Sequence, residues 1–515
     1  MDAPASSPDA LPRSAAGTHS PWLIAVVVSL ATFMEVLDTT IANVSLRHIA
    51  GGLGSGQDES TWILTSYLIS NAIVLPASGW LSTLIGRKRF YMACVAIFTV
   101  SSGLCALAPN LGWMLFFRVL QGAGGGGLAP TEQSIFADSF PPQQRAVAFA
   151  LYGVTVVVAP AVGPVLGGWL TESYSWHWIF LINLPVGAVA LALIWLLVND
   201  PPAVREDTRR FRASFVPDWL GLVLVALTFG ALQVTLDRFE QEDGFQSLQI
   251  DIAFAVMAFS AVALVWWERL HPQPVFDVRL FRVRSFAVAN LLMFLLGFTL
   301  YSTTQLLPQM AQTLLQYDAL KAGQALAAGG LAAALMMPFA GIISSKVPGK
   351  LLLVGAFVAT ALAFLHTSTL NLNMSFGTLS LTRIYQSLPL PFLFVTLTTA
   401  GYVGVPPDKN SNASAIINLM RNLGGSVGVA VATTDMAWRT QFHHARLAEH
   451  VTASGPAGAA LGHPDRLAAL QQAVQAQAQL LSYLDIFYAW AIIALCVAPF
   501  ALLLKSPPKG AARVH

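Results

Sequence analysis

The sequence carries few charges. Only 10% of its 515 residues are Asp, Glu, Lys or Arg, whereas a soluble domain carries about a quarter. Apolar residues make up 55%, and the mean hydropathy is +0.62. So few charges cannot cover a chain of this size with a surface that faces water, which excludes an ordinary soluble protein. Because the apolar residues fall in runs of about twenty, the length of a membrane-spanning helix, we expect an all-α polytopic membrane protein.

Cysteine is scarce as well. Cys94, Cys105 and Cys496 all fall inside apolar runs, where free cysteine usually serves as a small hydrophobe. A disulfide framework and a cysteine metal site are therefore not expected. The sequence has no G-x-x-x-x-G-K-[ST] motif, so an ATP-driven pump would need a separate motor chain. We expect no cofactor, no metal and no nucleic-acid partner, with a proton gradient as the energy source.

The basic residues predict how the chain is oriented. Fourteen apolar stretches, the first near 22–46 and the last near 484–504, predict fourteen spans. If the N-terminus lies in the cytoplasm, the inner segments hold most of the Lys and Arg residues, among them Arg87, Lys88 and Arg89. Cytoplasmic segments of membrane proteins collect such residues. Both termini are therefore expected in the cytoplasm.

Ionisable residues inside predicted spans are candidate functional groups, because a charge in hydrocarbon is costly. Glu35 and Asp38 are three residues apart and so share one face of the first span. Burial favours the protonated form of a carboxyl group, and contact with water favours its charged form. A proton antiporter uses this exchange. The alternative is that either residue caps or gates the wet end of the helix.

The fourth span contains Arg118, Gln121 and Glu132. Arginine cannot lose its charge, so a buried Arg118 needs a partner, and Asp38 or Glu35 are the available carboxylates. An ion pair that switches would suit proton coupling, for which we take Asp38, Glu35, Arg118 and Glu132 as candidates. The alternative is that Arg118 reaches to the membrane interface.

Glycine and proline gather in two spans. Gly122, Gly124 and Gly127 match G-x-G-x-x-G, but no βαβ pattern surrounds them, so close helix packing is favoured over nucleotide binding. The fifth span combines prolines and glycines, which remove helix hydrogen bonds and side-chain bulk together. We expect this span to be kinked and to form a moving interface. Its residues are Pro160, Gly163, Pro164, Gly167 and Gly168.

Together these segments resemble the major facilitator superfamily, and within it the fourteen-helix drug/proton antiporters of the EmrB and QacA type. Five segments carry the resemblance: LDTTIANVSL over 37–46, GWLSTLIGRKR over 79–89, RVLQGAGGG over 118–126, GVTVVVAPAVGPVLGG over 153–168 and NASAIINLMRNLGGSVGVA over 412–430. They imply a conformational role for Gly79, Gly86, Arg87, Arg421 and Asn422. Thr83 stands where the loop motif of the family usually has an Asp, which puts the usual charge clamp in doubt.

The resemblance implies two pseudo-symmetric six-helix halves and two extra helices. The expected segments are a tail over 1–20, the first half over 21–198, a linker over 199–217, the extra helices over 218–268, a linker over 269–284, the second half over 285–504 and a tail over 505–515. An internal echo agrees: Arg118-Val-Leu-Gln121 in the fourth span matches Arg383-Ile-Tyr-Gln386 in the twelfth.

A long outer segment over 437–483 is expected in the second half. Its later part has Leu467, Leu470, Val474 and Leu481 at helical spacing, which predicts an amphipathic helix. The apolar face of this helix lies either on the transporter itself or on the membrane. The resemblance also implies a periplasmic membrane-fusion adaptor and an outer-membrane channel as partners.

From these features we predict a proton-coupled multidrug efflux transporter of the bacterial inner membrane, which exports hydrophobic or amphiphilic compounds by alternating access. Protons that enter from outside would neutralise Asp38. Candidate cavity residues are Asn43, Gln121, Gln133, Tyr301, Gln305 and Asn418, chosen as polar residues at mid-span. The alternatives are a facilitator or proton symporter of a small metabolite and a membrane-embedded enzyme, for which the spans offer only a lone histidine, His366.

Overall fold

The computed structural model describes residues 20–504 apart from 240, 243 and 452–463. This part of the chain is built from helices, without strands, and twelve of its helices are long and apolar enough to cross a membrane. The prediction of an all-α polytopic membrane protein is confirmed. The expected tails over 1–19 and 505–515 lie outside the described residues.

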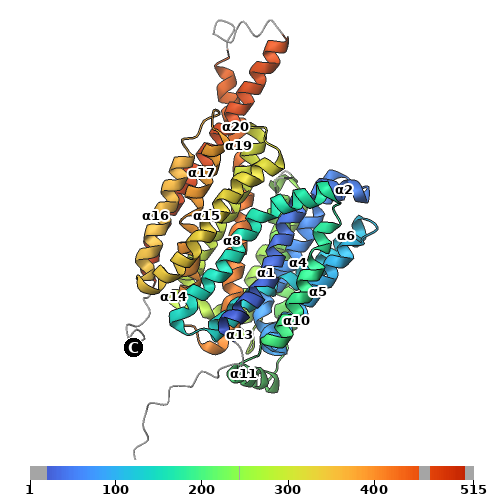
Figure 1. The fold of residues 1–515 in the computed structure, drawn as a ribbon, viewed down its shortest axis with the longest axis vertical. Helices are drawn as coiled ribbons and strands as arrows, with labels where there is room; N and C mark the ends of the chain where they lie inside the picture. The colour runs from blue at the N-terminus through green and yellow to red at the C-terminus, as the bar shows by residue number, and fades with distance from the viewer. Residues whose placement is uncertain (1–19, 240, 243, 452–463, 505–515) are drawn as a thin grey trace, which may run out of the picture.

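The first half of the chain forms a bundle, coloured blue to green in Figure 1. Its long helices are α1 (Pro21–Val44), α4 (Trp62–Ile85), α5 (Arg87–Ala106), α8 (Pro142–Ser173) and α10 (Asn183–Leu197). Short helices α2 (Leu46–Leu53), α3 (Gln57–Ser60) and α9 (Trp178–Leu181) join them. Despite its internal prolines, Pro160 and Pro164, α8 remains one continuous helix.

The fourth crossing is broken into α6 (Leu111–Gly125) and α7 (Leu128–Ser139). Asn110 begins α6, because its side chain accepts a hydrogen bond from the backbone N–H of Trp113. The break falls at Gly126 and Gly127, and glycine is among the weakest helix formers. A side chain at Gly127 would collide with Phe90 of α5, so this glycine lets the two helices approach closely.

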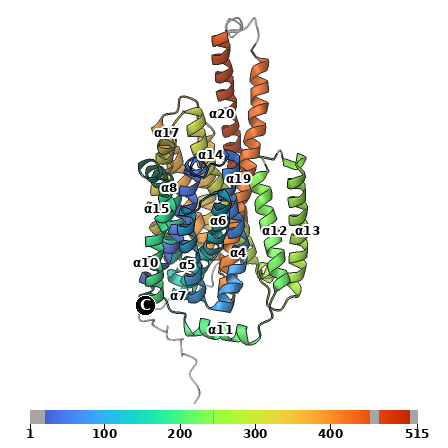
Figure 2. The same cartoon turned by 90° about the vertical axis from the view of Figure 1, so that its right-hand side faces the viewer.

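Three further helices lie between the two halves in the sequence: α11 (Pro202–Ala213), α12 (Trp219–Arg238) and α13 (Leu248–Leu270). Helix α11 runs across one end of the bundle, and α12 and α13 stand together at its side (Figure 2). Helix α12 contacts both α4 of the first half and α19 of the second. The extra pair therefore bridges the two halves instead of standing apart from them.

The second half, coloured yellow to red in Figure 1, repeats the pattern of the first. It comprises α14 (Arg284–Leu314), α15 (Ala319–Lys346), α16 (Gly349–Thr367), the broken pair α17 (Phe376–Ser387) and α18 (Leu390–Gly401), α19 (Asn410–Glu449) and α20 (Pro464–Val497). Pro389 lies between α17 and α18 and lacks the N–H that a continuous helix needs.

Helices α19 and α20 extend as an antiparallel pair beyond the other helices (Figures 1 and 2). At 40 residues, α19 is about 60 Å long, which is twice the thickness of the hydrocarbon core. We call the projecting parts of the two helices, residues 437–449 of α19 and 464–483 of α20, the hairpin. The outer segment over 437–483 thus holds two helical arms, with the amphipathic stretch in α20. We call this end of the bundle the hairpin end and the opposite end the α11 end.

The number of crossings depends on the two broken pairs. Neither α6 with α7 nor α17 with α18 is a single uninterrupted helix, so neither is among the twelve long helices of the described chain. Each pair occupies the place of a predicted span. The count of fourteen therefore stays a prediction, as do the cytoplasmic termini.

Glycines determine how closely the halves and their helices pack. On α19, a side chain at Gly424 or Gly428 would collide with the backbone of α14 at Phe294 or Phe298. Between the halves, a Cβ at Gly79 of α4 would lie 2.7 Å from the Cα of Asn412 on α19. Real Cβ atoms do not approach this closely, so any larger residue would push the halves apart at the α11 end.

Candidate functional site

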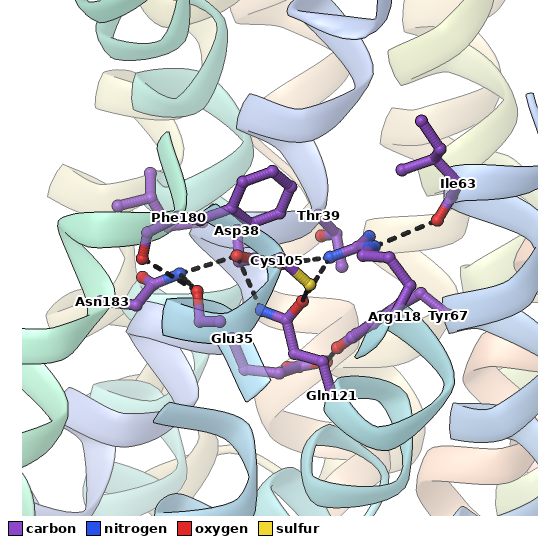
Figure 3. A network of polar contacts seen from close by, with 12 residues as sticks. Glu35, Asp38, Thr39, Ile63, Tyr67, Cys105, Arg118, Gln121, Phe180 and Asn183 are labelled. Carbon is purple, nitrogen blue, oxygen red and sulfur yellow. Dashed lines mark hydrogen bonds and ion pairs between the residues drawn. The ribbon is translucent and has the colours of Figure 1, made fainter. Parts of the chain in front are cut away.

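A buried ion pair joins α1 to α6 (Figure 3). The Arg118 Nη1 donates to Asp38 Oδ2 at 2.8 Å, and both side chains are almost completely buried. Asp38 also accepts hydrogen bonds from Gln121 Nε2 at 3.0 Å and from Asn183 Nδ2 at 2.7 Å. Arg118 also donates from Nε to the Ile63 carbonyl at 3.0 Å and makes a cation–π contact with the Tyr67 ring. The carboxylate therefore has partners on two other helices, α6 and α10.

Helical spacing explains this arrangement. Arg118 and Gln121 are three residues apart and so lie on one face of α6, where Arg118 Nη1 also donates to Gln121 Oε1 at 2.7 Å. Asn183 opens α10 and is fixed by a second bond to Ser102 Oγ at 3.0 Å. The structure thus brings Arg118 and Asp38 together, as one of the two sequence interpretations proposed. A buried charge pair of this kind needs such extra hydrogen bonds to be tolerated.

Glu35 lies one turn before Asp38 but in a different environment. Its Oε1 accepts a hydrogen bond from Tyr67 Oη at 2.9 Å and a longer one from Asn71 Nδ2 at 3.4 Å, both on α4. Unlike Asp38, Glu35 has no Arg or Lys within ion-pair distance among the described residues, and it lines the central cavity. It is therefore the carboxyl group of the first span that faces the cavity.

The central cavity has a volume of about 610 Å³ and lies between the halves. This size is typical of sites for drug-sized ligands. Its walls come from α1, α4, α8 and α12 on one side and from α14, α17 and α19 on the other. The cavity is lined both by apolar residues, such as Leu68, Phe229 and Leu300, and by polar ones. Such a lining suits an amphiphilic molecule.

Only some of the sequence-predicted residues line this cavity. Glu35, Tyr301 and Gln305 do, and so do Pro160, Arg421 and Asn422 from the motifs. Gln121 is instead fully buried in the Asp38 network. Asn43 is exposed in the last turn of α1, where the helix has passed the cavity.

The other predicted polar residues join the halves at the α11 side of the cavity. Asn418 Oδ1 on α19 accepts from Tyr152 Oη of α8 at 3.1 Å and from Gln133 Nε2 of α7 at 3.5 Å. Arg421 Nη1 donates to the same Tyr152 Oη at 2.8 Å. Glu132, one residue before Gln133, instead accepts a hydrogen bond from Ser29 Oγ of α1. These groups hold helices together and, apart from Arg421, do not line the cavity.

The α11 end is closed by a second set of contacts between the halves. Arg87 forms an ion pair with Asp138 at the end of α7. Asp138 Oδ1 also accepts from Asn410 Nδ2 at the start of α19, at 2.7 Å. Thr83 donates back to the Gly79 carbonyl of its own helix at 2.9 Å. Where the family's loop motif usually has an Asp, this chain therefore has a hydroxyl group that donates to its own helix. The acidic partner of Arg87 comes from α7.

Two glycines of these motifs have clear structural reasons. Gly86 ends α4 with φ +95°, a conformation that side chains with a Cβ rarely adopt. On α8, a side chain at Gly163 would collide with Thr40 of α1, and Gly167 faces Ile41. Gly168 points away from both neighbours, with nothing within 4 Å of a Cβ built there. The motif therefore packs α8 against α1 beside the cavity.

Several polar cavity residues were not predicted from the sequence, among them Gln233 and Asp237 of α12 and Arg383 of α17. Gln233 Nε2 donates to Asp237 Oδ1 at 2.8 Å, and its Oε1 accepts from Ser426 Oγ of α19 at 3.2 Å. The signal was present, since Gln233 and Asp237 form an i, i+4 polar pair in an apolar span. The sequence alone does not show that α12 meets the cavity, because periodicity gives a face of a helix but not its neighbour.

Comparison with known proteins agrees with this architecture. The chain matches the Major Facilitator Superfamily over residues 28–429. It is 36% identical over 442 residues to the multidrug export protein EmrB of Haemophilus influenzae, covering 86% of this chain and 85% of that protein. It is 34% identical over 499 residues to EmrB of Escherichia coli, covering 95% and 96%. The fatty acid resistance protein FarB of Neisseria gonorrhoeae is 34% identical over 504 residues, covering 95% and 97%.

A solved structure with the same fold is that of the human organic anion transporter MFSD10. It has a TM-score of 0.60 at 15% identity and covers 94% of this chain and 100% of that chain. At this identity the likeness concerns the fold alone. The chain belongs to the major facilitator superfamily. It is a transporter and not an enzyme, and it is a multi-pass protein of the bacterial inner membrane.

Proposed function

We propose that this protein is a proton-coupled multidrug efflux transporter that exports hydrophobic or amphiphilic compounds by alternating access. The observation that carries the proposal is a largely apolar cavity between the two halves with a carboxyl group, Glu35, in its wall. Relatives that are named multidrug export proteins and align along most of the chain support it. An apolar cavity accepts varied cargo, and a carboxyl group in its wall exchanges a proton.

Proton exchange is assigned to Glu35 and not to Asp38, because Asp38 does not line the cavity. In this mechanism a proton from outside neutralises Glu35 and displaces cargo. The halves then rock, and Glu35 releases the proton when it meets the cytoplasm. The Asp38–Arg118 pair lies one turn away and joins α1 to α6, and in this proposal its role is structural.

We infer that the α11 end faces the cytoplasm and that the chain crosses the membrane fourteen times, with each broken pair as one crossing. Basic residues support this orientation, because Arg87, Arg145, Lys346 and Lys409 all lie at helix ends on the α11 side. Since contacts between the halves close that end, the structure corresponds to a state closed to the cytoplasm.

The direct test is cargo-dependent proton movement in proteoliposomes with an imposed pH gradient. A lipophilic cation and an amphiphilic weak acid serve as cargoes. We expect addition of cargo to drive proton movement opposite to cargo flux. Downhill uptake of a metabolite without proton movement would instead identify a facilitator, and movement of both in one direction a symporter.

We further propose that the hairpin contacts a periplasmic adaptor, which would connect export to an outer-membrane channel. The hairpin projects beyond the other helices and exposes apolar side chains, among them Phe442 and Leu467. At its base Arg439 and His443 both contact Asp485 at 2.8 Å, which ties the two arms together.

Replacing both Phe442 and Leu467 with Ser should lower efflux from intact cells several-fold, because adaptor contacts would be lost. Transport in proteoliposomes, where no adaptor is present, should equal that of the unaltered protein. Unchanged efflux from cells would contradict the docking role, and equal losses in both systems would indicate damage to the transporter.

A further inference from the structure

The two halves differ at one pair of matching positions, and the difference concerns charge. In the first half, Arg118 of α6 donates to Gln121 three residues on and pairs with Asp38 of α1. In the second half, Arg383 of α17 likewise donates from Nη1 to Gln386 Oε1, at 3.4 Å. Helix α14 is the counterpart of α1, but at this level it supplies hydroxyl groups instead of a carboxylate.

Arg383 therefore has no counter-ion among the described residues. Its Nη1 donates to Thr303 Oγ1 at 3.1 Å and its Nη2 to Thr304 Oγ1 at 3.0 Å. Its Nε is buried and has no hydrogen-bond partner. The side chain is only 6% exposed, yet it lines the central cavity. A guanidinium that keeps its charge away from water needs an anion, and the protein does not provide one here.

The space around Arg383 is built into the fold. Gly329 of α15 packs against it, so that a Cβ there would lie 2.5 Å from Arg383 Cγ. The other cavity arginine, Arg421, is bonded across the halves to Tyr152. The cavity carboxyl groups, Glu35 and Asp237, come from α1 and α12. Among the described residues neither cavity arginine has a carboxylate within ion-pair distance, but of the two only Arg383 leaves a guanidinium nitrogen buried without a hydrogen-bond partner.

We propose that Arg383 binds the carboxylate of an anionic amphiphilic cargo. This assignment rests on the proposed transport function and narrows it to a substrate class. A guanidinium matches a carboxylate through paired N–H donors, and such charge-assisted hydrogen bonds are stronger than neutral ones. The apolar body of the molecule would lie along Leu300, Leu326 and Leu390, which line the same cavity.

The test uses the full-length protein in nanodiscs of phosphatidylcholine, which carries no net charge. Fluorescence titrations, corrected with empty nanodiscs, compare pyrenebutyrate with its neutral counterpart pyrenebutanol. We expect Arg383→Gln to weaken pyrenebutyrate binding roughly ten- to hundredfold, the range for lost hydrogen bonds to a charged group. Pyrenebutanol binding should stay unchanged, and Arg383→Lys should retain part of the affinity.

A second variant keeps Arg383 but gives it a carboxylate partner from the protein itself. Thr303→Asp would supply the carboxylate that the first half has, so pyrenebutyrate should bind more weakly while pyrenebutanol binds as before. Arg446→Gln, in the hairpin, is the matched control and should leave both ligands unaffected. The proposal is overturned if pyrenebutyrate does not bind, if Arg383→Gln binds it normally, or if both ligands are lost equally. Because no gradient is involved, these failures would leave the efflux proposal standing.

Discussion

Replacing Glu35 with Gln is expected to reduce cargo-dependent proton movement in proteoliposomes to background. Gln is nearly isosteric and can still accept the hydrogen bond from Tyr67 Oη, but it cannot exchange a proton. Because the cavity walls remain, the variant should still bind pyrenebutanol and should move cargo down its own gradient. The measurement is the proton flux, followed with a pH-sensitive dye inside the vesicles, at equal amounts of incorporated protein.

The matched control is Glu206→Gln, which makes the same change at an exposed carboxyl group of α11 and should leave the coupling at Glu35 intact. If Glu35→Gln still couples cargo to protons, the exchanging group lies elsewhere. The candidates would then be Asp237, the other carboxyl group in the cavity wall, and Asp38, which the sequence suggested.

The second large effect concerns stability. Asp38→Asn should lower the free energy of unfolding by about 3–5 kcal/mol, the usual cost of leaving one partner of a buried ion pair uncompensated. Arg118 stays charged in this variant, and no other carboxylate of the described residues lies within ion-pair distance of it. The double variant Asp38→Asn with Arg118→Gln should lose less than the single one, because no buried charge remains. Unfolding of the purified protein in detergent, followed by intrinsic fluorescence, measures these differences.

The two single variants should also differ in their response to pH. In Arg118→Gln the unpaired group is Asp38, which becomes neutral by taking up a proton, so the loss of stability should shrink as the pH falls. In Asp38→Asn the unpaired group is an arginine, and the loss should remain. Equal stability of Asp38→Asn and the double variant would mean that an unpaired charge on Arg118 carries no cost.

The sequence predicts the architecture of this protein well and the cavity less well. Apolar runs and low charge are sufficient to predict a membrane bundle. In hydrocarbon every span must satisfy its own backbone hydrogen bonds, which a helix does. The spacing of Arg118 and Gln121, and its repeat at Arg383 and Gln386, also predicts a common local geometry, and both arginines do donate to their glutamines.

Cavity residues are harder to predict, because a polar side chain at mid-span either bonds to a neighbouring helix or faces the cavity. Gln121 and Asn418 have the same polarity as Gln305, yet the first two hold helices together and only Gln305 faces the cavity. Helical periodicity gives a face for each residue but not the neighbour that this face meets. The breaks near Gly126 and Pro389 likewise depend on packing.

The place of α12 affects how cargo reaches the cavity. This helix contacts α4 and α19 and contributes Phe229, Gln233 and Asp237 to the cavity wall. A bundle without it would have a seam between α4 and α19 open to the acyl chains of the bilayer. With α12 in place, a molecule dissolved in the lipid meets a helix along this seam. It must therefore pass through an aqueous mouth or along another side of the bundle.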